Sequence, residues 1–140
     1  MTKETAVRGL GEIALRVESL EEMQSFYENV IRLELLRRFE TSAFFKIADG
    51  YGGHTQILAL FDRTAIENYQ PISAANTTVD HLAFTVDLAD FESELARLKA
   101  LGCSVWTSEH AWVQWRSLYL KDPEDNTVEL VCFDPSIARL

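Results

Sequence analysis

A chain of 140 residues, 47% of them hydrophobic, is long enough for one domain or for two small modules that pack closely, and it can build an apolar core. The formal net charge of −9 argues against nucleic acid or an anionic membrane surface as a partner. No apolar run approaches the roughly 18 residues of a membrane span, and the first residues lack the apolar region of a signal peptide. We therefore expect a cytoplasmic protein.

The first half of the chain predicts a strand, a helix and three further strands. A helix over about residues 20–31 begins at a capping box formed by Ser19 and Glu22, and apolar residues recur in it at helical spacing. Alternating or continuous apolar runs predict the strands, which we place at residues 11–17, 33–39, 43–47 and 54–61. This half is therefore a βαβββ module over about residues 10–61.

The second half repeats this order after a connecting segment at residues 62–78, in which a helical turn could form at residues 65–69. A strand at 80–87 parallels the first strand of the chain, and a helix over about 90–101 ends at Gly102. A strand at 103–106 and a hairpin at 117–133 complete a second βαβββ module at residues 79–133. The whole chain is then one domain built by internal duplication.

The two cysteines, Cys103 and Cys132, lack the spacing of a metal site. Each lies in a predicted strand. We expect buried free thiols, which are usual in a reducing compartment.

The hairpin carries the most information. Turn-forming residues from Asp122 to Asn126 separate two runs rich in aromatic and β-branched residues. In the second strand Glu129 shares a face with Val131 and Phe133, so its carboxylate should be partly enclosed. Such a carboxylate needs a partner or a metal. The alternative is a glutamate on an edge strand that faces water.

The first and the last strand of each half each carry one polar residue in mid-strand. In the two first strands the next residue on the same face is small, Ala14 or Ala83, and leaves space over that face. We therefore expect a cleft lined by these four polar side chains, with the helices outside the sheet. They are Glu12, Gln56, His81 and Glu129.

The run from Leu118 to Val131 resembles the last hairpin of the vicinal-oxygen-chelate superfamily, which includes glyoxalase I, bleomycin-resistance proteins and extradiol dioxygenases. Asp125 stands where that family usually has glycine. The resemblance implies an α+β fold in which two βαβββ modules form a curved mixed sheet around a cleft. It also implies metal ligands at Glu129 and His81, whose contexts match the family closely, and at the corresponding positions Glu12 and Gln56.

A site with one imidazole, two carboxylates and one amide suits Zn²⁺, Ni²⁺, Mn²⁺ or Fe²⁺. The resemblance then implies a metal-dependent lyase or isomerase of glyoxalase type, acting on a small substrate with two adjacent oxygens, with Glu129 or Glu12 moving a proton. A metal-free binding protein remains open if His81 bonds a backbone carbonyl, Glu12 pairs with Arg16 and Gln56 is a core amide. A ring-cleaving dioxygenase would require His54 as a second histidine ligand.

Other residues are candidates for contact with the substrate. Aromatic side chains could form an apolar wall, and a cation could neutralise a substrate carboxylate or phosphate. The alternative for the tryptophans is the interface of a homodimer, since Trp is enriched in interfaces. The candidates are Trp112, Trp115, Tyr119, Phe44, His54 and Arg16, with Lys46 and Arg116 as further cations.

Overall fold

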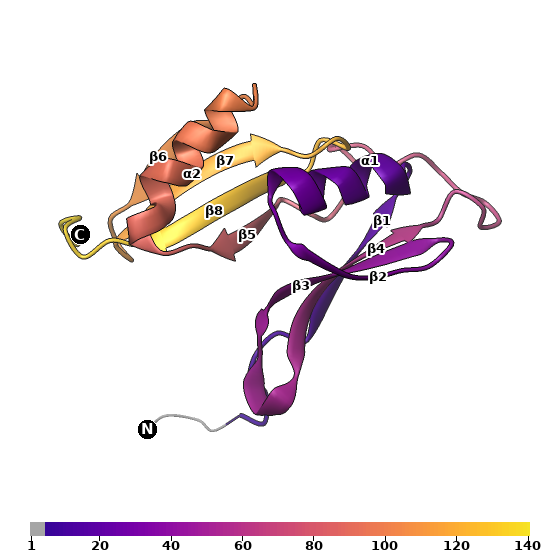
Figure 1. The fold of residues 1–140 in the computed structure, drawn as a ribbon, viewed down its shortest axis with the longest axis horizontal. Helices are drawn as coiled ribbons and strands as arrows, with labels where there is room; N and C mark the ends of the chain where they lie inside the picture. Colours follow the sequence, from indigo (N-terminus) through magenta and orange to yellow (C-terminus); the bar gives the residue numbers. More distant parts are fainter. Residues whose placement is uncertain (1–4) are drawn as a thin grey trace. The chain divides into compact units, whose positions relative to one another are not determined.

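The computed structural model describes residues 5–140, which form two compact units (Figure 1). Unit 1 ends at Pro71 and unit 2 begins at Ile72, so the boundary falls within the predicted connecting segment. Each unit contains one four-stranded sheet.

Unit 1 has the sheet order β1-β4-β3-β2. The outer strand β1 runs parallel to β4, and the other neighbours are antiparallel. The α-helix α1 continues directly into the π-helical segment η1. Together the two segments span nearly all of the helix predicted at residues 20–31. The elements are β1 (Glu12–Val17), α1 (Leu20–Ser25), η1 (Phe26–Val30), β2 (Glu34–Arg38), β3 (Ser42–Asp49), η2 (Tyr51–Gly53) and β4 (Thr55–Asp62).

The core of unit 1 lies between its helix and one face of its sheet. The Ser19 hydroxyl accepts from the backbone N–H of Glu22 at the start of α1, as the sequence predicts. Residues on the inner face are buried beneath Met23 and Tyr27 of the helical segment. These sheet residues are Leu15, Val17, Phe45, Leu58 and Leu60.

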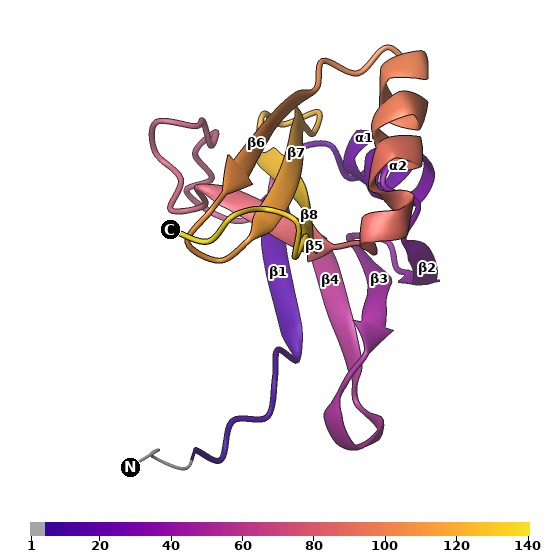
Figure 2. The same cartoon turned by 90° about the vertical axis from the view of Figure 1, so that its left-hand side faces the viewer.

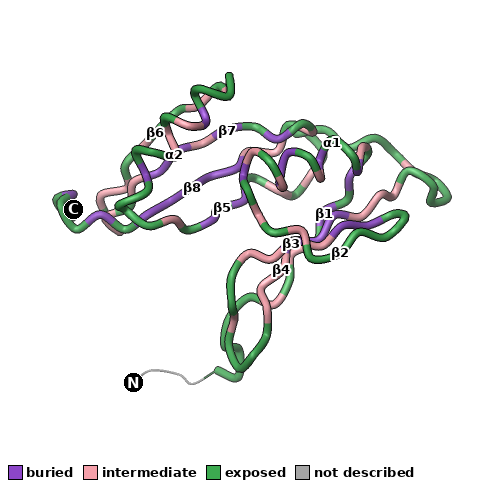
Figure 3. The backbone as a smooth tube through the Cα atoms, viewed as in Figure 1, coloured by how far each residue is buried: buried purple, intermediate pink, exposed green. Residues whose placement is uncertain are grey.

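Unit 2 has the same order of strands, β5-β8-β7-β6, again with the first pair parallel. The strand β8 is central and is buried along most of its length (Figure 3). The helix α2 runs along one side of the strands (Figure 2). The elements are β5 (His81–Thr85), α2 (Leu88–Ala100), β6 (Trp106–His110), β7 (Trp115–Lys121) and β8 (Thr127–Phe133).

The two faces of the unit 2 sheet differ in character. Apolar side chains on one face pack with Phe91 and Leu98 of α2. They come from alternating positions of three strands, so the residues between them point to the opposite face. These apolar residues are Leu82, Phe84, Leu118, Leu120, Val128 and Leu130.

The turn of the β7–β8 hairpin follows the chemistry of its residues. The carboxylate of Asp122 accepts from the backbone N–H of Glu124 and of Asn126, at 2.9 and 3.0 Å. Asp125 adopts the left-handed region with φ of 69°, which aspartate tolerates better than most residues. The hairpin therefore forms without a glycine in its turn.

Two expected elements differ in the structure. The strand predicted at residues 103–106 is wrong, because Gly102 has φ of 86° and the N–H of Cys103 bonds back to the Leu98 carbonyl, which closes the helix. The strand begins only at Trp106. Residues 65–69 form turns and not a helix. Cys103 is half-buried and outside any strand, whereas Cys132 is buried in β8, and both are free thiols.

Among residues 5–140, no helix combines the length and the apolar character needed to cross a membrane.

An ion pair between half-buried Arg116 and buried Asp134 joins the helix-side face of β7 to the segment after β8. Arg116 donates from Nε and Nη2 to Asp134 Oδ2, at 3.0 and 2.8 Å. The hydroxyl and the N–H of Ser136 donate to Oδ1, at 2.7 and 2.9 Å. The Ser136 hydroxyl, followed by Arg116, lowers the pKa of Asp134 from 3.8 to about 2.

We predict that Asp134→Asn destabilises the protein in a pH-dependent way. The lowered pKa means that the carboxylate stabilises the fold above the unfolded pKa of about 4. This stabilisation disappears as the pH falls to about 2, since the unfolded chain takes up the proton first. Urea unfolding of both proteins should show a difference that is largest above pH 4 and shrinks towards pH 2. A difference that stays constant from pH 6 to pH 2 would contradict this.

Candidate functional site

The face of the unit 2 sheet opposite α2 carries most of the candidate residues. Residues paired across neighbouring strands point to the same side of a sheet. The pairing therefore assigns a common face to alternating residues of all four strands. They are His81, Ala83 and Thr85 of β5, Thr127, Glu129, Val131 and Phe133 of β8, Trp115, Ser117, Tyr119 and Lys121 of β7, and Trp106, Ser108 and His110 of β6.

At the centre of this face His81 and Glu129 form a pair. His81 Nε2 lies 3.2 Å from Glu129 Oε1. The side chain of Glu129 is 5% exposed, whereas that of His81 is 43% exposed. The alternative of a glutamate on an edge strand is therefore excluded, because β8 is central and its carboxylate is enclosed.

Each member of the pair has a second polar contact, on the atom that faces away from the other member. Asp80 Oδ2 lies 2.7 Å from His81 Nδ1, and the Ser117 hydroxyl donates to Glu129 Oε2 at 2.5 Å. Both ring nitrogens of His81 thus face carboxylates, rather than a backbone carbonyl. The outer contacts leave Nε2 and Oε1 directed at each other. A carboxylate on the far nitrogen of a histidine is the usual support for a metal ligand.

The pair is suitable for a divalent metal, but it is incomplete. With metal–ligand bonds of about 2.1 Å, two neighbouring ligand atoms lie about 3.0 Å apart at 90° and about 3.4 Å apart in a tetrahedral site, and the 3.2 Å between Nε2 and Oε1 falls between these values. Imidazole nitrogen and carboxylate oxygen suit the metals expected from the sequence. Within residues 5–140, no group of three or more His, Cys, Asp or Glu side chains is placed to hold an ion. Unit 2 therefore supplies two donors.

In unit 1 the register separates two of the predicted ligands. Glu12 of β1 pairs with Ile57 of β4, so these two residues share a face. Gln56 precedes Ile57 and points to the other side, the side of Ile13 and of the helix-covered core. The prediction that Gln56 shares a face with Glu12 is wrong.

The repeat shows which residue of unit 1 corresponds to the buried glutamate. In unit 2 that glutamate stands two residues beyond the strand partner of His81. The partner of Glu12 is Ile57, and two residues beyond it is Ala59. Unit 1 has no donor at the corresponding position.

The remaining candidates in unit 1 fall on both faces. Arg16 and Phe44 share the face of Glu12, since they pair with Phe61 and Ala59 of β4. His54 stands two residues before Gln56 and therefore points to the same side. A Cβ on Gly11 would lie 3.4 Å from the His54 ring, and Gly11, as the neighbour of Glu12, faces the side opposite to Glu12. The geometry therefore gives no support to His54 as a ligand beside Glu12.

The cations named with them have other partners. Lys46 Nζ lies 3.0 Å from Asp49, which raises the pKa of the lysine through their hydrogen bond. Arg116 lies on the helix-side face, where it contacts Glu109 at 3.1 Å in addition to Asp134. Arg116 is thus not on the face of the candidate site.

Aromatic residues border the His81–Glu129 pair in unit 2. Trp115 and Tyr119 share its face, as their sequence parity predicts. Trp112 lies in the turn between β6 and β7 and is 68% exposed. Trp106, which sequence reasoning missed, stacks on Tyr119 with ring centroids 5.5 Å apart and an interplanar angle of 14°.

Sequence reasoning also missed Ser117, Ser108 and the role of Asp80. Ser117 stands two residues before Tyr119, so the alternation of β7 could have placed it beside the glutamate. Ser108 and His110 could not be placed, because the strand that carries them was assigned to earlier residues.

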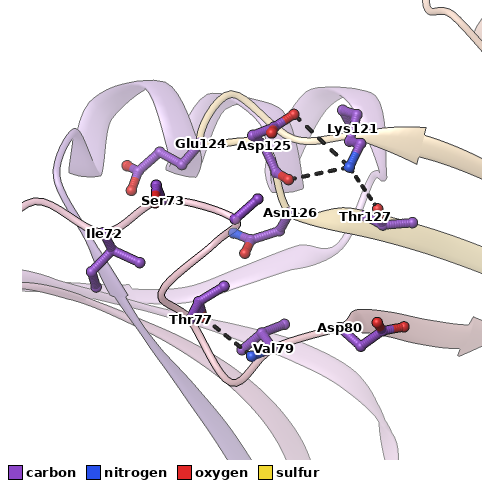
Figure 4. Close-up of a pocket in the computed structure, with 11 residues that line it drawn as sticks. Ile72, Ser73, Thr77, Val79, Asp80, Lys121, Glu124, Asp125, Asn126 and Thr127 are labelled. Atoms are coloured by element: carbon purple, nitrogen blue, oxygen red, sulfur yellow. Dashed lines mark hydrogen bonds and ion pairs between the residues drawn. The ribbon is translucent and has the colours of Figure 1, made fainter.

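A small pocket of about 250 Å³ lies at the hairpin end of unit 2 (Figure 4). Its one cation, Lys121, donates to Thr127 Oγ1 at 2.8 Å and to the Asp125 carbonyl at 3.4 Å. Asp80, which contacts His81, is among the lining residues, whereas His81 and Glu129 are not. The lining residues are Ile72, Ser73, Ala74, Thr77, Val79, Asp80, Lys121, Glu124, Asp125, Asn126 and Thr127.

Known proteins resemble the chain along most of its length. The glutathione transferase FosA of Serratia marcescens is 27% identical over 124 residues, which are 89% of this chain and 80% of that protein. The lactoylglutathione lyase of Agrobacterium tumefaciens is 28% identical with a TM-score of 0.68, over 91% of this chain and 96% of that chain. The fosfomycin resistance protein FosX of Listeria monocytogenes, solved with Mn(II) and a sulfate ion, has a TM-score of 0.66 at 22% identity, over 92% of this chain and 93% of that chain, and shows the fold alone.

The fold class expected from the sequence is confirmed, with two βαβββ modules that each contain a mixed sheet. A family model matches residues 9–130, which include all strands except the end of β8. The chain therefore belongs to the Glyoxalase/Bleomycin resistance protein/Dioxygenase superfamily.

Proposed function

We propose that the protein is a divalent-metal enzyme of glyoxalase type, whose small substrate presents two adjacent oxygens. The observation that carries the proposal is the 3.2 Å approach of His81 Nε2 to Glu129 Oε1, with both side chains supported from behind. Two relatives, 27% and 28% identical, carry glutathione in their names, so thiol adducts are the first substrates to test.

In this proposal His81 Nε2 and Glu129 Oε1 hold the ion. Glu12 is retained as a further ligand on the strength of the sequence alone. Gln56 is not retained, since it points to the helix-covered face of its sheet. A divalent ion in such a site would polarise a substrate carbonyl and stabilise the charge that develops on its oxygen.

Glu129 is also the proposed proton-transfer group, with Glu12 as the second candidate for that role. The Ser117 hydroxyl donates to Oε2, so Oε1, which faces His81 Nε2, would be the carboxylate atom that takes a proton from the substrate in place of holding the ion. Asp80 holds Nδ1 of His81 and thereby sets which ring nitrogen faces the glutamate.

A second candidate function is metal-free binding of a small molecule. The observation that favours it is the 3.2 Å separation of His81 Nε2 and Glu129 Oε1, since a proton between these two atoms would join the pair without an ion. Trp115 and Tyr119, which share the face of the pair, would then contribute apolar surface around the ligand.

We also infer a homodimer in the cytoplasm. Several aromatic side chains of unit 2 are largely exposed, and large exposed apolar groups are common in interfaces between proteins. They are Trp106, Trp112, Trp115 and Phe133. Light scattering coupled to gel filtration measures the mass of the assembly directly.

We predict that Zn²⁺, Ni²⁺, Mn²⁺ or Fe²⁺ raises the melting temperature of metal-free protein by several degrees. A ligand at a hundredfold excess over its Kd stabilises a fold by about 2.7 kcal/mol. His81→Ala and Glu129→Gln should lose most of the rise, whereas His54→Ala, on the opposite face of unit 1 from Glu12, should keep it. An unchanged melting temperature in the wild type, with no metal in protein purified without chelators, would contradict the metal-dependent function. Only metal-free binding of a small molecule would then remain.

We predict that Glu129→Gln lowers turnover by at least about a hundredfold, because an amide cannot take the proton and is a poorer metal ligand than a carboxylate. Turnover is measured with the adduct of methylglyoxal and glutathione, which is an isomer of lactoylglutathione, and with fosfomycin plus glutathione. Circular dichroism should show an unchanged fold. A Glu129→Gln variant that retains wild-type turnover would refute the role of this residue.

We predict that Ser117→Ala destabilises the protein by about 1–3 kcal/mol, because a buried carboxylate oxygen loses its hydrogen-bond donor. Urea unfolding measures the loss. The same substitution should cost clearly less in a Glu129→Ala background, where no carboxylate remains. Equal losses in the two backgrounds would mean that Ser117 acts through packing alone.

A further inference from the structure

A second polar cluster lies on the same face of unit 2, and the function proposed above gives its polar atoms no role. Ser108 Oγ and His110 Nε2 each lie 2.9 Å from the Tyr119 hydroxyl, and they are 3.2 Å from each other. All three side chains are half-buried, so they are ordered by their contacts and still open to a ligand.

The cluster is next to the candidate metal pair. Tyr119 of β7 stands directly opposite Glu129 of β8, and both point to the face away from α2. Ser108 and His110 come from β6, the strand on the other side of β7. Neighbouring strands are about 4.8 Å apart, so the cluster begins one strand away from the buried carboxylate.

The chemistry of a phenol limits what Tyr119 can offer to a ligand. Its oxygen has one proton to donate and two lone pairs that can accept. If Ser108 and His110 both donate to this oxygen, both lone pairs are used. The phenol proton then has no acceptor within the cluster and is available to a ligand on the open face.

This arrangement requires a particular tautomer of His110, the one that carries its proton on Nε2. The other tautomer would accept the phenol proton, and Tyr119 would then offer only a lone pair. Trp106 stacks on the Tyr119 ring and limits its rotation, which keeps the hydroxyl beside the two β6 side chains.

We propose that Ser108 and His110 are positioning residues that turn the Tyr119 hydroxyl into a hydrogen-bond donor for a third oxygen of the substrate. The inference rests on the proposed function, since the other two oxygens are those that the metal site would hold. It narrows the substrate class to compounds that carry an acceptor oxygen beyond the two adjacent ones.

Two simple chelators separate this third contact from metal binding. Oxalate binds a metal through two adjacent oxygens and keeps further acceptor oxygens, whereas catechol has only the two. In calorimetric titrations of the Zn²⁺-loaded protein, Tyr119→Phe should weaken oxalate binding about fivefold, the effect of one net hydrogen bond. Its affinity for catechol should stay within about twofold of the wild type, because catechol has no third oxygen to lose.

The role of His110 is tested through Tyr119. His110→Phe should weaken oxalate binding as much as Tyr119→Phe does, and it should add nothing in the Tyr119→Phe background. His110→Gln should restore most of the affinity, since its amide nitrogen can donate from the position of Nε2. Wild-type oxalate affinity in His110→Phe, an additive loss in the double variant, or an equal loss for catechol would overturn the proposal.

A measurement without metal keeps this inference separate from the function it rests on. ¹⁵N NMR of the metal-free protein should show the proton of His110 on Nε2, with a shift of that signal in Tyr119→Phe. A proton on Nδ1 would overturn the proposal whatever the metal site does. A wild-type protein that shows the Nε2 proton but binds neither Zn²⁺ nor oxalate would instead refute the proposed function.

Discussion

The carboxylate of Glu129 is enclosed, and the arrangement of unit 2 depends on satisfying its oxygen atoms. Removing such a group from water costs several kcal/mol unless hydrogen bonds replace the lost hydration. The two contacts come from different neighbours, Ser117 on β7 and His81 on β5. Glu129 can receive both contacts only because β8 lies between β5 and β7. The strand order of the sheet is therefore what allows a buried carboxylate on its polar face.

Local features of the chain could be predicted from sequence, and features that depend on register could not. Turn residues fix the last hairpin, and alternation within β8 places Glu129 with its aromatic neighbours. No pattern within a strand shows which residue stands opposite on the next one. A displacement of one residue moves a side chain to the other face of the sheet. The sequence predicts Gln56 on the face of Glu12, whereas in the structure the strand partner of Glu12 is Ile57. The turn that ends α2 extends to Cys103, so β6 begins at Trp106 and not at residue 103 as the sequence predicts. Ser108 therefore lies in a strand that the sequence does not predict there.

The polar face of unit 2 can be described as three zones along one surface. The pocket at the hairpin end is mostly polar, the centre holds the imidazole and the carboxylate, and the β6 side carries the phenol cluster with its tryptophan. A single small molecule placed over the centre could touch either neighbouring zone. The centre is shared by the metal-dependent and the metal-free function, so specificity within this superfamily fold would arise from the flanking zones.

The alanine of β4 that corresponds to the buried glutamate limits how alike the two halves of the chain can be. Ala59 has no accessible surface. An acidic side chain there would need space that the packed strand lacks, and partners like those on β5 and β7. One substitution at Ala59 is therefore not enough to make the two halves of the chain chemically equivalent.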